Sequence, residues 1–144
     1  MRHLHLLDKN YPLNSDQISF YRNNGFIKLK NIFDAETLRF FEQSISHKVD
    51  QKSKDSIPLK KRDTYGKAFL QILNLWTEDE EIKRFVFSKR LAKIATELME
   101  VEGVRMYHDQ ALYKEGDGGF TPWHADQYYW PLSSDKTITA WIPL

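Results

Sequence analysis

TPWHADQYYW, residues 121–130, places a histidine and an aspartate two positions apart within an aromatic run. Extended segments rich in aromatic residues favour strand, and the side chains of a strand point alternately to its two faces. His124 and Asp126 are therefore expected on one face, with their Cα atoms roughly 6.6 Å apart. Two metal bonds of about 2.1 Å at right angles need donor atoms about 3 Å apart, so both side chains can bind one ion.

An imidazole and a carboxylate are two of the three ligands in the 2-His-1-carboxylate facial triad of non-haem Fe(II) oxygenases. The same spacing also fits a strand whose His124 and Asp126 only hydrogen-bond to each other, because polar groups in a fold are usually paired. A His-x-Asp match is short and arises easily by chance. The spacing alone leaves both interpretations open, and the surrounding sequence has to separate them.

The surrounding sequence resembles the phytanoyl-CoA dioxygenase family in two places. TPWHADQYYWPLSSDKTITAWIPL, residues 121–144, resembles the family's iron-binding segment. FYRNNGFIKLKNIFDAETLRFFEQSI, residues 20–45, resembles its opening strand and helix. The first match has a His-x-Asp, an aromatic-Pro turn and a strand with Trp and Pro, at His124, Asp126, Trp130-Pro131, Trp141 and Pro143. The two matches come in the family's order and span nearly the whole chain, but only about the first half of the family's domain.

The resemblance implies an α+β fold, a double-stranded β-helix (jelly roll, cupin-like) with N-terminal helices packed on it. Residues 1–144 would form a single domain, the N-terminal part of such a dioxygenase domain. It also implies a non-haem Fe(II)/2-oxoglutarate-dependent dioxygenase that hydroxylates an aliphatic C–H of a small organic substrate. His124 and Asp126 would be the catalytic metal ligands for Fe(II), with 2-oxoglutarate as co-substrate.

The resemblance also implies contacts with 2-oxoglutarate. In the family a basic residue approaches it from a strand near Lys67 or Gln71, and neither residue matches that position firmly. A polar contact falls near Gln110. A tryptophan like Trp141 lies beside the co-substrate, which fits an apolar wall with a few polar groups.

No histidine follows His124 in this sequence. In the family, the second histidine ligand and the arginine that binds 2-oxoglutarate both come later. We therefore expect the chain to be truncated before the barrel closes and to be inactive alone. His108 is a second candidate ligand, but a hydrogen-bonded pocket or core histidine is the better interpretation. Two alternatives stay open: a non-catalytic cupin-like module that binds a small ligand, and a fragment that needs a partner chain.

Composition narrows the class of protein. The 144 residues are 41% hydrophobic and 14% aromatic, as in a folded domain. A net charge of +1 predicts no general affinity for nucleic acid or anionic membrane, which leaves a small-molecule substrate as the expected partner. With no cysteine, no apolar run long enough for a signal peptide and no membrane span, we expect a cytoplasmic protein. The oligomeric state is not indicated.

Periodicity and capping residues predict the other elements. One helix should start at Asn14 or Ser15 and stop at Gly25. A second should start after Asp34 with an apolar stripe of Leu38, Phe41 and Ile45. A Thr77 capping box and Ser88 should open two more, with Ile82, Phe85, Leu91, Ile94 and Leu98 turned inward. Strands are expected within residues 26–30, 65–76, 104–114 and 137–143.

Residues 46–63 are rich in mixed charges without periodicity. That composition is typical of a solvated loop. A mobile cover over the active site, whose lysines attract an anionic substrate, is the other interpretation. The sequence does not separate these two.

Overall fold

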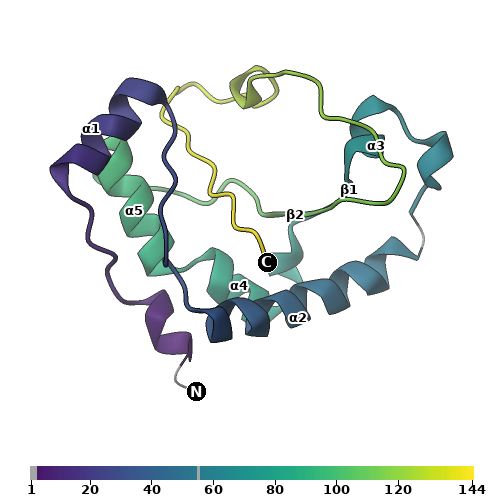
Figure 1. Cartoon of the computed structure of the whole chain (residues 1–144), viewed down its shortest axis with the longest axis horizontal. Coiled ribbons are helices and arrows are strands. Elements are labelled where there is room, and N and C mark those ends of the chain that lie inside the picture. Colours follow the sequence, from purple (N-terminus) through teal and green to yellow (C-terminus); the bar gives the residue numbers. More distant parts are fainter. Residues whose placement is uncertain (1–2, 55) are drawn as a thin grey trace.

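The computed structural model describes residues 3–54 and 56–144 (Figure 1). These described residues contain five α-helices and two strands, in the order α1 (Ser15–Asn24), α2 (Ala35–Ser53), α3 (Thr64–Ala68), β1 (Leu70–Leu73), α4 (Glu80–Val86), α5 (Lys89–Met99) and β2 (Gln110–Tyr113). The same residues also form four 3-10 turns: η1 (His3–Leu7), η2 (Leu59–Lys61), η3 (Leu75–Thr77) and η4 (Asp126–Tyr128). The described part of the chain is therefore a mixture of helices and a small antiparallel sheet, in agreement with the α+β expectation.

The helix boundaries follow from local capping, as predicted. Asn14 accepts a hydrogen bond from the Gln17 N–H, and the Gln17 side chain accepts one from the Asn14 N–H, which forms a capping box. Gly25 ends α1 in the left-handed conformation at φ 77°, where a side chain would be strained. The Asp34 side chain accepts from the Thr37 N–H at the start of α2. These helix ends depend on neighbouring residues only.

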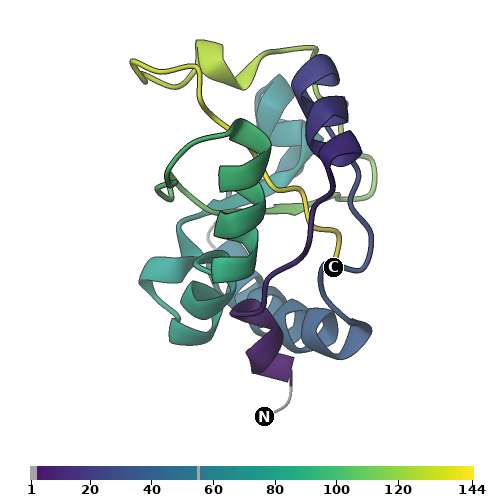
Figure 2. The ribbon, with the colours of Figure 1, turned by 90° about the vertical axis from the view of Figure 1, so that its left-hand side faces the viewer.

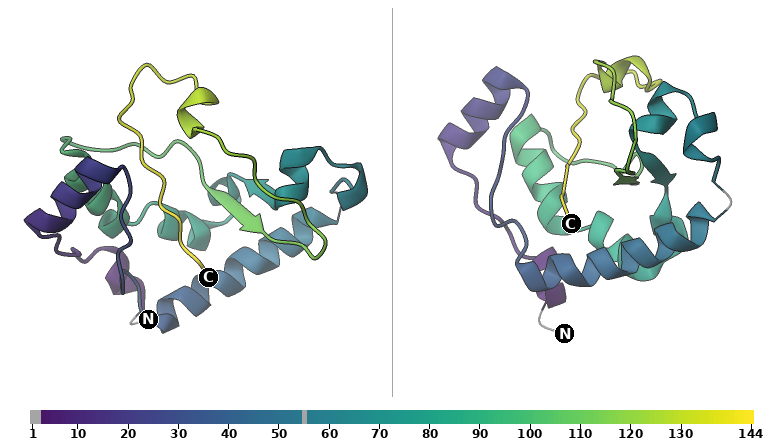
Figure 3. Two further views of the ribbon diagram at one scale, coloured as in Figure 1. Left: turned by 45° about the horizontal axis from the view of Figure 1, so that its top comes forward. Right: turned by 45° about the vertical axis from the view of Figure 1, so that its right-hand side comes forward.

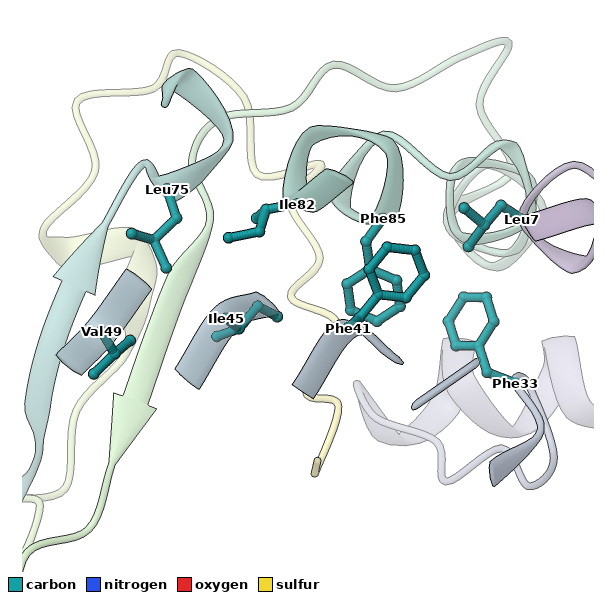
Figure 4. Close-up of a cluster of buried hydrophobic side chains, with 8 residues drawn as sticks. All are labelled: Leu7, Phe33, Phe41, Ile45, Val49, Leu75, Ile82 and Phe85. Carbon is teal, nitrogen blue, oxygen red and sulfur yellow. The ribbon is translucent and has the colours of Figure 1, made fainter. Parts of the chain in front are cut away.

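The core lies where α2 crosses α4 and η3 (Figure 4). The rings of Phe41 and Phe85 stack with centroids 4.5 Å apart and planes at 19°. Phe33 packs on the same Phe85 ring at 5.3 Å. The buried cluster consists of Leu7, Phe33, Phe41, Ile45, Val49, Leu75, Ile82 and Phe85. The predicted inward positions on α2 and α4 are thus confirmed, and α5 adds buried Ile94 and Leu98.

Over the part of the chain that the structure describes, the sheet contains only β1 and β2, paired antiparallel with Leu70 opposite Tyr113 and Leu73 opposite Gln110. Side chains of one face, which carries Leu70, Ile72, Ala111 and Tyr113, pack against the core cluster. The alternation of a strand puts Gln71 and Gln110 on the opposite face. This sheet is shorter than the sequence predicts, and the double-stranded β-helix is not seen among residues 3–54 and 56–144.

Several expected strands are wrong in extent or in kind. Residues 26–30, 121–130 and 137–143 form no strand, while β1 and β2 are shorter than the predicted 65–76 and 104–114. Strand composition shows that a segment suits a pleated surface, but a strand forms only where a neighbour completes its hydrogen bonds. Residues 64–68 are helical instead, because Asp63 caps α3 by accepting from the Gly66 N–H.

The predicted loop 46–63 is also wrong in its first part, since α2 continues to Ser53 and buries Val49. The polar residues around Val49 are the solvent face of one amphipathic helix. The predicted Thr77 capping box is replaced by Asp79, whose side chain accepts from the Glu81 and Ile82 N–H groups. Ser88 caps α5 as predicted by accepting from the Leu91 N–H.

Residues 114–144, called the excursion below, follow β2 and form no regular structure except η4. They extend away from α2 and then run back, so that the chain ends near α2 (Figures 1 and 3). This return brings Ile142 against the core cluster. In the view turned by 90°, η4 lies at the top of the molecule, α5 in the middle and α2 at the bottom (Figure 2). Among the residues described, no helix combines the length and apolar character needed to cross a membrane.

Candidate functional site

His124 and Asp126 lie in the excursion after β2, close together although the segment is not a strand. Ala125 is extended and η4 starts at Asp126, so the backbone turns between the two side chains. His124 Nε2 is 3.2 Å from Asp126 Oδ1. This separation is close to the approximately 3 Å between two donor atoms that bind one metal ion at right angles. The predicted convergence is therefore confirmed, while the predicted strand geometry is not.

A hydrogen bond to the backbone sets the orientation of the His124 ring. Its Nδ1 is 2.7 Å from the Pro122 carbonyl oxygen. A carbonyl oxygen only accepts, so Nδ1 carries the hydrogen and donates it. In a neutral imidazole, Nε2 then turns its lone pair toward the Asp126 carboxylate. Two lone pairs at this distance repel each other, so two arrangements fit the contact: a protonated His124 paired with Asp126, which is the alternative that the sequence left open, or a metal cation between the two side chains.

This arrangement fits a metal ligand. Histidines that bind metal usually donate their other ring N–H to a carbonyl or carboxylate, which fixes the tautomer. An imidazole nitrogen and a carboxylate oxygen are also the donors used for non-haem Fe(II). Residues 3–54 and 56–144 contain no group of three or more His, Cys, Asp or Glu side chains that could hold an ion. The candidate site consequently consists of two side chains, and both are partly exposed.

Two tyrosines that the sequence analysis did not single out stand beside His124. The ring of Tyr65, from α3, lies 6.1 Å from the His124 ring, and the ring of Tyr129 lies 6.2 Å from it. Their hydroxyl oxygens are 2.9 Å apart and share a hydrogen bond. That bond, with smaller contributions from desolvation and the charge of Tyr65, raises the pKa of Tyr129 above its ordinary value of 10.0. Tyr129 belongs to the quoted aromatic run, but nothing in the sequence links it to Tyr65.

The four residues predicted to contact 2-oxoglutarate lie on different elements, and two of them, Gln71 and Gln110, contact each other. Gln110 Nε2 donates to Gln71 Oε1 at 2.6 Å across the exposed face of the sheet, so these two candidates do come together. Trp141 is 66% exposed and its ring lies 6.2 Å from that of Phe69, the residue between α3 and β1. Lys67 is on α3, two residues from Tyr65.

Within the described part of the chain, His108 does not form a three-membered group of possible ligands with His124 and Asp126. Its ring packs between Tyr107 and Trp130, with centroid distances of 5.1 and 5.9 Å. The interpretation of His108 as a packed histidine is the one that these contacts support. The neighbouring Asp109 points elsewhere and accepts from the Leu75 and Trp76 N–H groups at the start of η3.

The loop that precedes the site is tied firmly to α3. The Gly119 N–H donates to the Lys67 carbonyl at 2.7 Å. The Lys114 ammonium donates to the carbonyls of Ala68 and Gly119. A Cβ at Gly118 would lie 2.9 Å from two backbone oxygens, so only glycine fits there. These contacts fix where the chain enters residues 120–130.

An ion pair adds to this attachment. Arg62, at the end of the polar segment, pairs with Glu115 and donates to the Ile57 and Gly66 carbonyls. Its side chain is only 10% exposed. The second half of segment 46–63 is thus held by Arg62 against the loop before the site, in a way that neither a solvated loop nor a mobile cover predicts.

Two hollows on the surface lie away from these residues. One is formed by η1, α4 and the start of α5, and the other by α1 with residues 26–28. Neither is lined by His124 or Asp126. The donor chemistry of the two side chains, rather than the shape of the surface, therefore locates the site.

Comparison with known proteins identifies the family. No curated protein and no solved structure matches the chain. The sequence model described as Phytanoyl-CoA dioxygenase (PhyH) matches residues 21–144, which include all of the candidate site residues. This match covers most of the chain and agrees with the resemblance noted at His124 and Asp126. The chain belongs to the phytanoyl-CoA dioxygenase family, a family of oxygenases whose members generally use Fe(II) and 2-oxoglutarate.

Proposed function

We propose that the chain is part of an Fe(II)/2-oxoglutarate-dependent dioxygenase that hydroxylates an aliphatic C–H of a small organic substrate, with His124 and Asp126 as two of the iron ligands. One observation carries the assignment. The Pro122 carbonyl accepts the hydrogen of His124 Nδ1, so Nε2 keeps a lone pair for a metal ion and lies 3.2 Å from Asp126 Oδ1. Family membership supplies the identity of the ion.

Each of the two side chains has a distinct part in holding the ion. His124 offers a neutral nitrogen whose direction is fixed by its second hydrogen bond. Asp126 offers a negative charge that partly neutralises a divalent cation. When bound, Fe(II) and 2-oxoglutarate supply the oxidation chemistry that side chains lack. The protein contributes orientation, open coordination positions and shelter from water.

The co-substrate would meet the exposed face of the sheet. Because Gln110 Nε2 donates to Gln71 Oε1, the Gln71 amide keeps its own two hydrogens for a carboxylate, and the Gln110 oxygen stays an acceptor. Trp141 provides an apolar surface, and Lys67 a positive charge from α3. Lys67 is a point charge rather than a bidentate fork, so a guanidinium would anchor the far carboxylate better.

The remaining ligands would come from other residues. The described residues supply no third ligand for the pair, and an Fe(II) site of this type needs one more histidine. We place it on a further stretch of polypeptide, in the same chain or in a second one, which also completes the double-stranded β-helix. The exposed rings of Trp123, Tyr128 and Trp141 are the surface that such strands would cover.

The test is iron-dependent succinate formation from 2-oxoglutarate. Residues 1–144 alone should show no turnover, while a protein that carries the additional strands should show it and should lose it with either His124→Ala or Asp126→Ala. A matched control is Asp135→Ala, which removes an exposed carboxylate from the same segment. Turnover that survives Asp126→Ala would refute the proposed function.

A further inference from the structure

We propose that Tyr65 and Tyr129 are positioning residues for His124: their hydroxyl pair and their ring edges hold the imidazole in the orientation that binds metal. This inference deepens the proposed function and rests on it only for the identity of the ion. It assigns to α3 a role in the metal site, although neither His124 nor Asp126 lies on that helix. It also explains why a tyrosine pair lies beside a ligand in an otherwise irregular segment.

The three rings form a nearly equilateral arrangement. The centroid distances are 6.1 Å for Tyr65–His124, 6.2 Å for Tyr129–His124 and 6.2 Å for Tyr65–Tyr129. The planes meet at 79°, 68° and 74°, so every pair packs edge to face. Such pairs are the favoured geometry of aromatic contacts. The imidazole is thus contacted by two rings, while its Nδ1–H is held by the Pro122 carbonyl.

The hydroxyl bond joins two parts of the chain. Tyr65 lies on α3 and Tyr129 lies directly after η4, 64 positions later. Asp126 is the first residue of η4, and the Tyr129 N–H donates to its carbonyl at 2.9 Å. The position of Tyr129 is therefore coupled to the position of Asp126, the second proposed ligand. The hydroxyl pair fixes both ligands relative to α3.

The α3 helix is a suitable anchor because it is itself held in place. The Lys67 carbonyl accepts from the Gly119 N–H, the Ala68 carbonyl accepts from Lys114, and Arg62 joins the Gly66 carbonyl to Glu115. Ala68 is buried. A short helix with these attachments moves little, so Tyr65 presents a fixed edge to His124. Metal ligands that lack such support bind less tightly.

The first measurement needs no metal. Tyr65→Phe and Tyr129→Phe keep both rings and remove only the shared hydrogen bond. Long-range ¹H–¹⁵N spectra of the His124 ring should show a single Nδ1–H tautomer in the wild-type chain. Each variant should show a mixture with the Nε2–H tautomer, because a ring that is no longer held in place can turn away from the Pro122 carbonyl. The matched control is Tyr107→Phe, whose ring contacts His108 and Trp130 instead. An unchanged His124 tautomer in both variants would overturn the proposal.

The second measurement is the affinity for Co(II), a visible substitute for Fe(II). We expect each single variant to bind Co(II) about tenfold more weakly, which is the usual scale for loss of a group that orients a metal ligand. The double variant should be no weaker than either single one, because both changes remove the same bond. Additive losses, or affinities equal to that of Tyr107→Phe, would contradict the positioning role.

The two measurements separate this inference from the proposed function. A wild-type chain with a single His124 tautomer that is lost in both variants supports positioning even where Co(II) does not bind the wild type; where Co(II) does bind, the variants must also bind it more weakly. If Co(II) binds as tightly to Asp126→Ala as to the wild type, the metal assignment fails. A tautomer and an affinity that ignore Tyr65→Phe and Tyr129→Phe leave the metal assignment standing and remove the role of the tyrosines.

Discussion

The α2 helix and the segment 121–144 are similar in length and opposite in character. Phe41 on α2 is fully buried and Val49 is 2% exposed, whereas Trp123 and Tyr128 in the second segment are 101% and 86% exposed. The helix makes its own backbone hydrogen bonds and needs a partner on one face only. The segment has the composition of strands, which need a neighbour for every hydrogen bond.

The difference shows how the candidate site keeps its geometry without regular structure. His124 is held by the Pro122 carbonyl and by two tyrosine rings. Gln127 ties the turn that follows, by donating to the Ser134 carbonyl and accepting from Thr137. These are local contacts in a largely exposed segment. The helices therefore supply most of the stability of the fold, while a few hydrogen bonds and ring contacts set the orientation of His124.

The largest expected contrast is in the free energy of unfolding. Phe41→Ala removes a ring stacked on Phe85 and should cost about 3–5 kcal/mol. Trp123→Ala removes a larger side chain that is fully exposed and should change stability by less than about 0.5 kcal/mol. Chemical denaturation of both variants measures the difference. Equal losses would show that the aromatic residues of the excursion belong to the core.

A smaller loss in the free energy of unfolding is expected from a substitution where the excursion contacts α3. Gly118→Ala places a methyl group 2.9 Å from the Glu115 and Lys67 carbonyl oxygens, and overpacking of this kind costs about 1–3 kcal/mol. Gly116→Ala is the matched control, because its methyl group meets nothing within 4 Å. Denaturation curves for the two variants compare them directly. If Gly116→Ala destabilises as much as Gly118→Ala, the close contact with α3 is not what fixes the loop.

The smallest effect is on the ionisation of Tyr129. The hydrogen bond that the Tyr129 hydroxyl shares with Tyr65 is the main cause of its raised pKa, so Tyr65→Phe should lower that pKa toward the ordinary 10.0. The bond favours the protonated phenol, and its contribution is present below pH 10.0 and is lost as the pH rises through the folded-state pKa. An NMR titration of the Tyr129 ring measures this. A pKa that does not fall in Tyr65→Phe would mean that the hydroxyl groups do not interact in solution.

The helical part of the fold could be predicted because its signals are local. Asn14, Gly25, Asp34 and Ser88 cap or end helices as expected, and Phe41 points inward. Strand predictions were less accurate, since the pairing of a strand depends on segments far away in the sequence. The composition of residues 121–130 indicates strand. Within the described chain, however, the strand pairing is that of β1 with β2, and residues 121–130 pair with no strand.

Only the part of the candidate site that depends on neighbouring residues could be predicted. His124 and Asp126 are two residues apart, so almost any backbone conformation keeps them near each other, and their convergence could be predicted. Tyr65 reaches His124 only through the fold, and no motif marks it. The roles of Lys67, Gln71, Gln110 and Trp141 rest on family resemblance and stay predictions, although Gln71 and Gln110 do lie together.

The most direct test of the metal assignment is a titration with Mn(II), whose unpaired electrons broaden nearby NMR signals. Wild-type chain should lose the signals of residues around His124 and of the Tyr65 ring first, while those of α2 stay sharp. Asp126→Ala should abolish this selective broadening, and Asp135→Ala should preserve it. Selective broadening near His124 that persists unchanged in Asp126→Ala, or broadening that begins elsewhere in the wild type, would contradict the account.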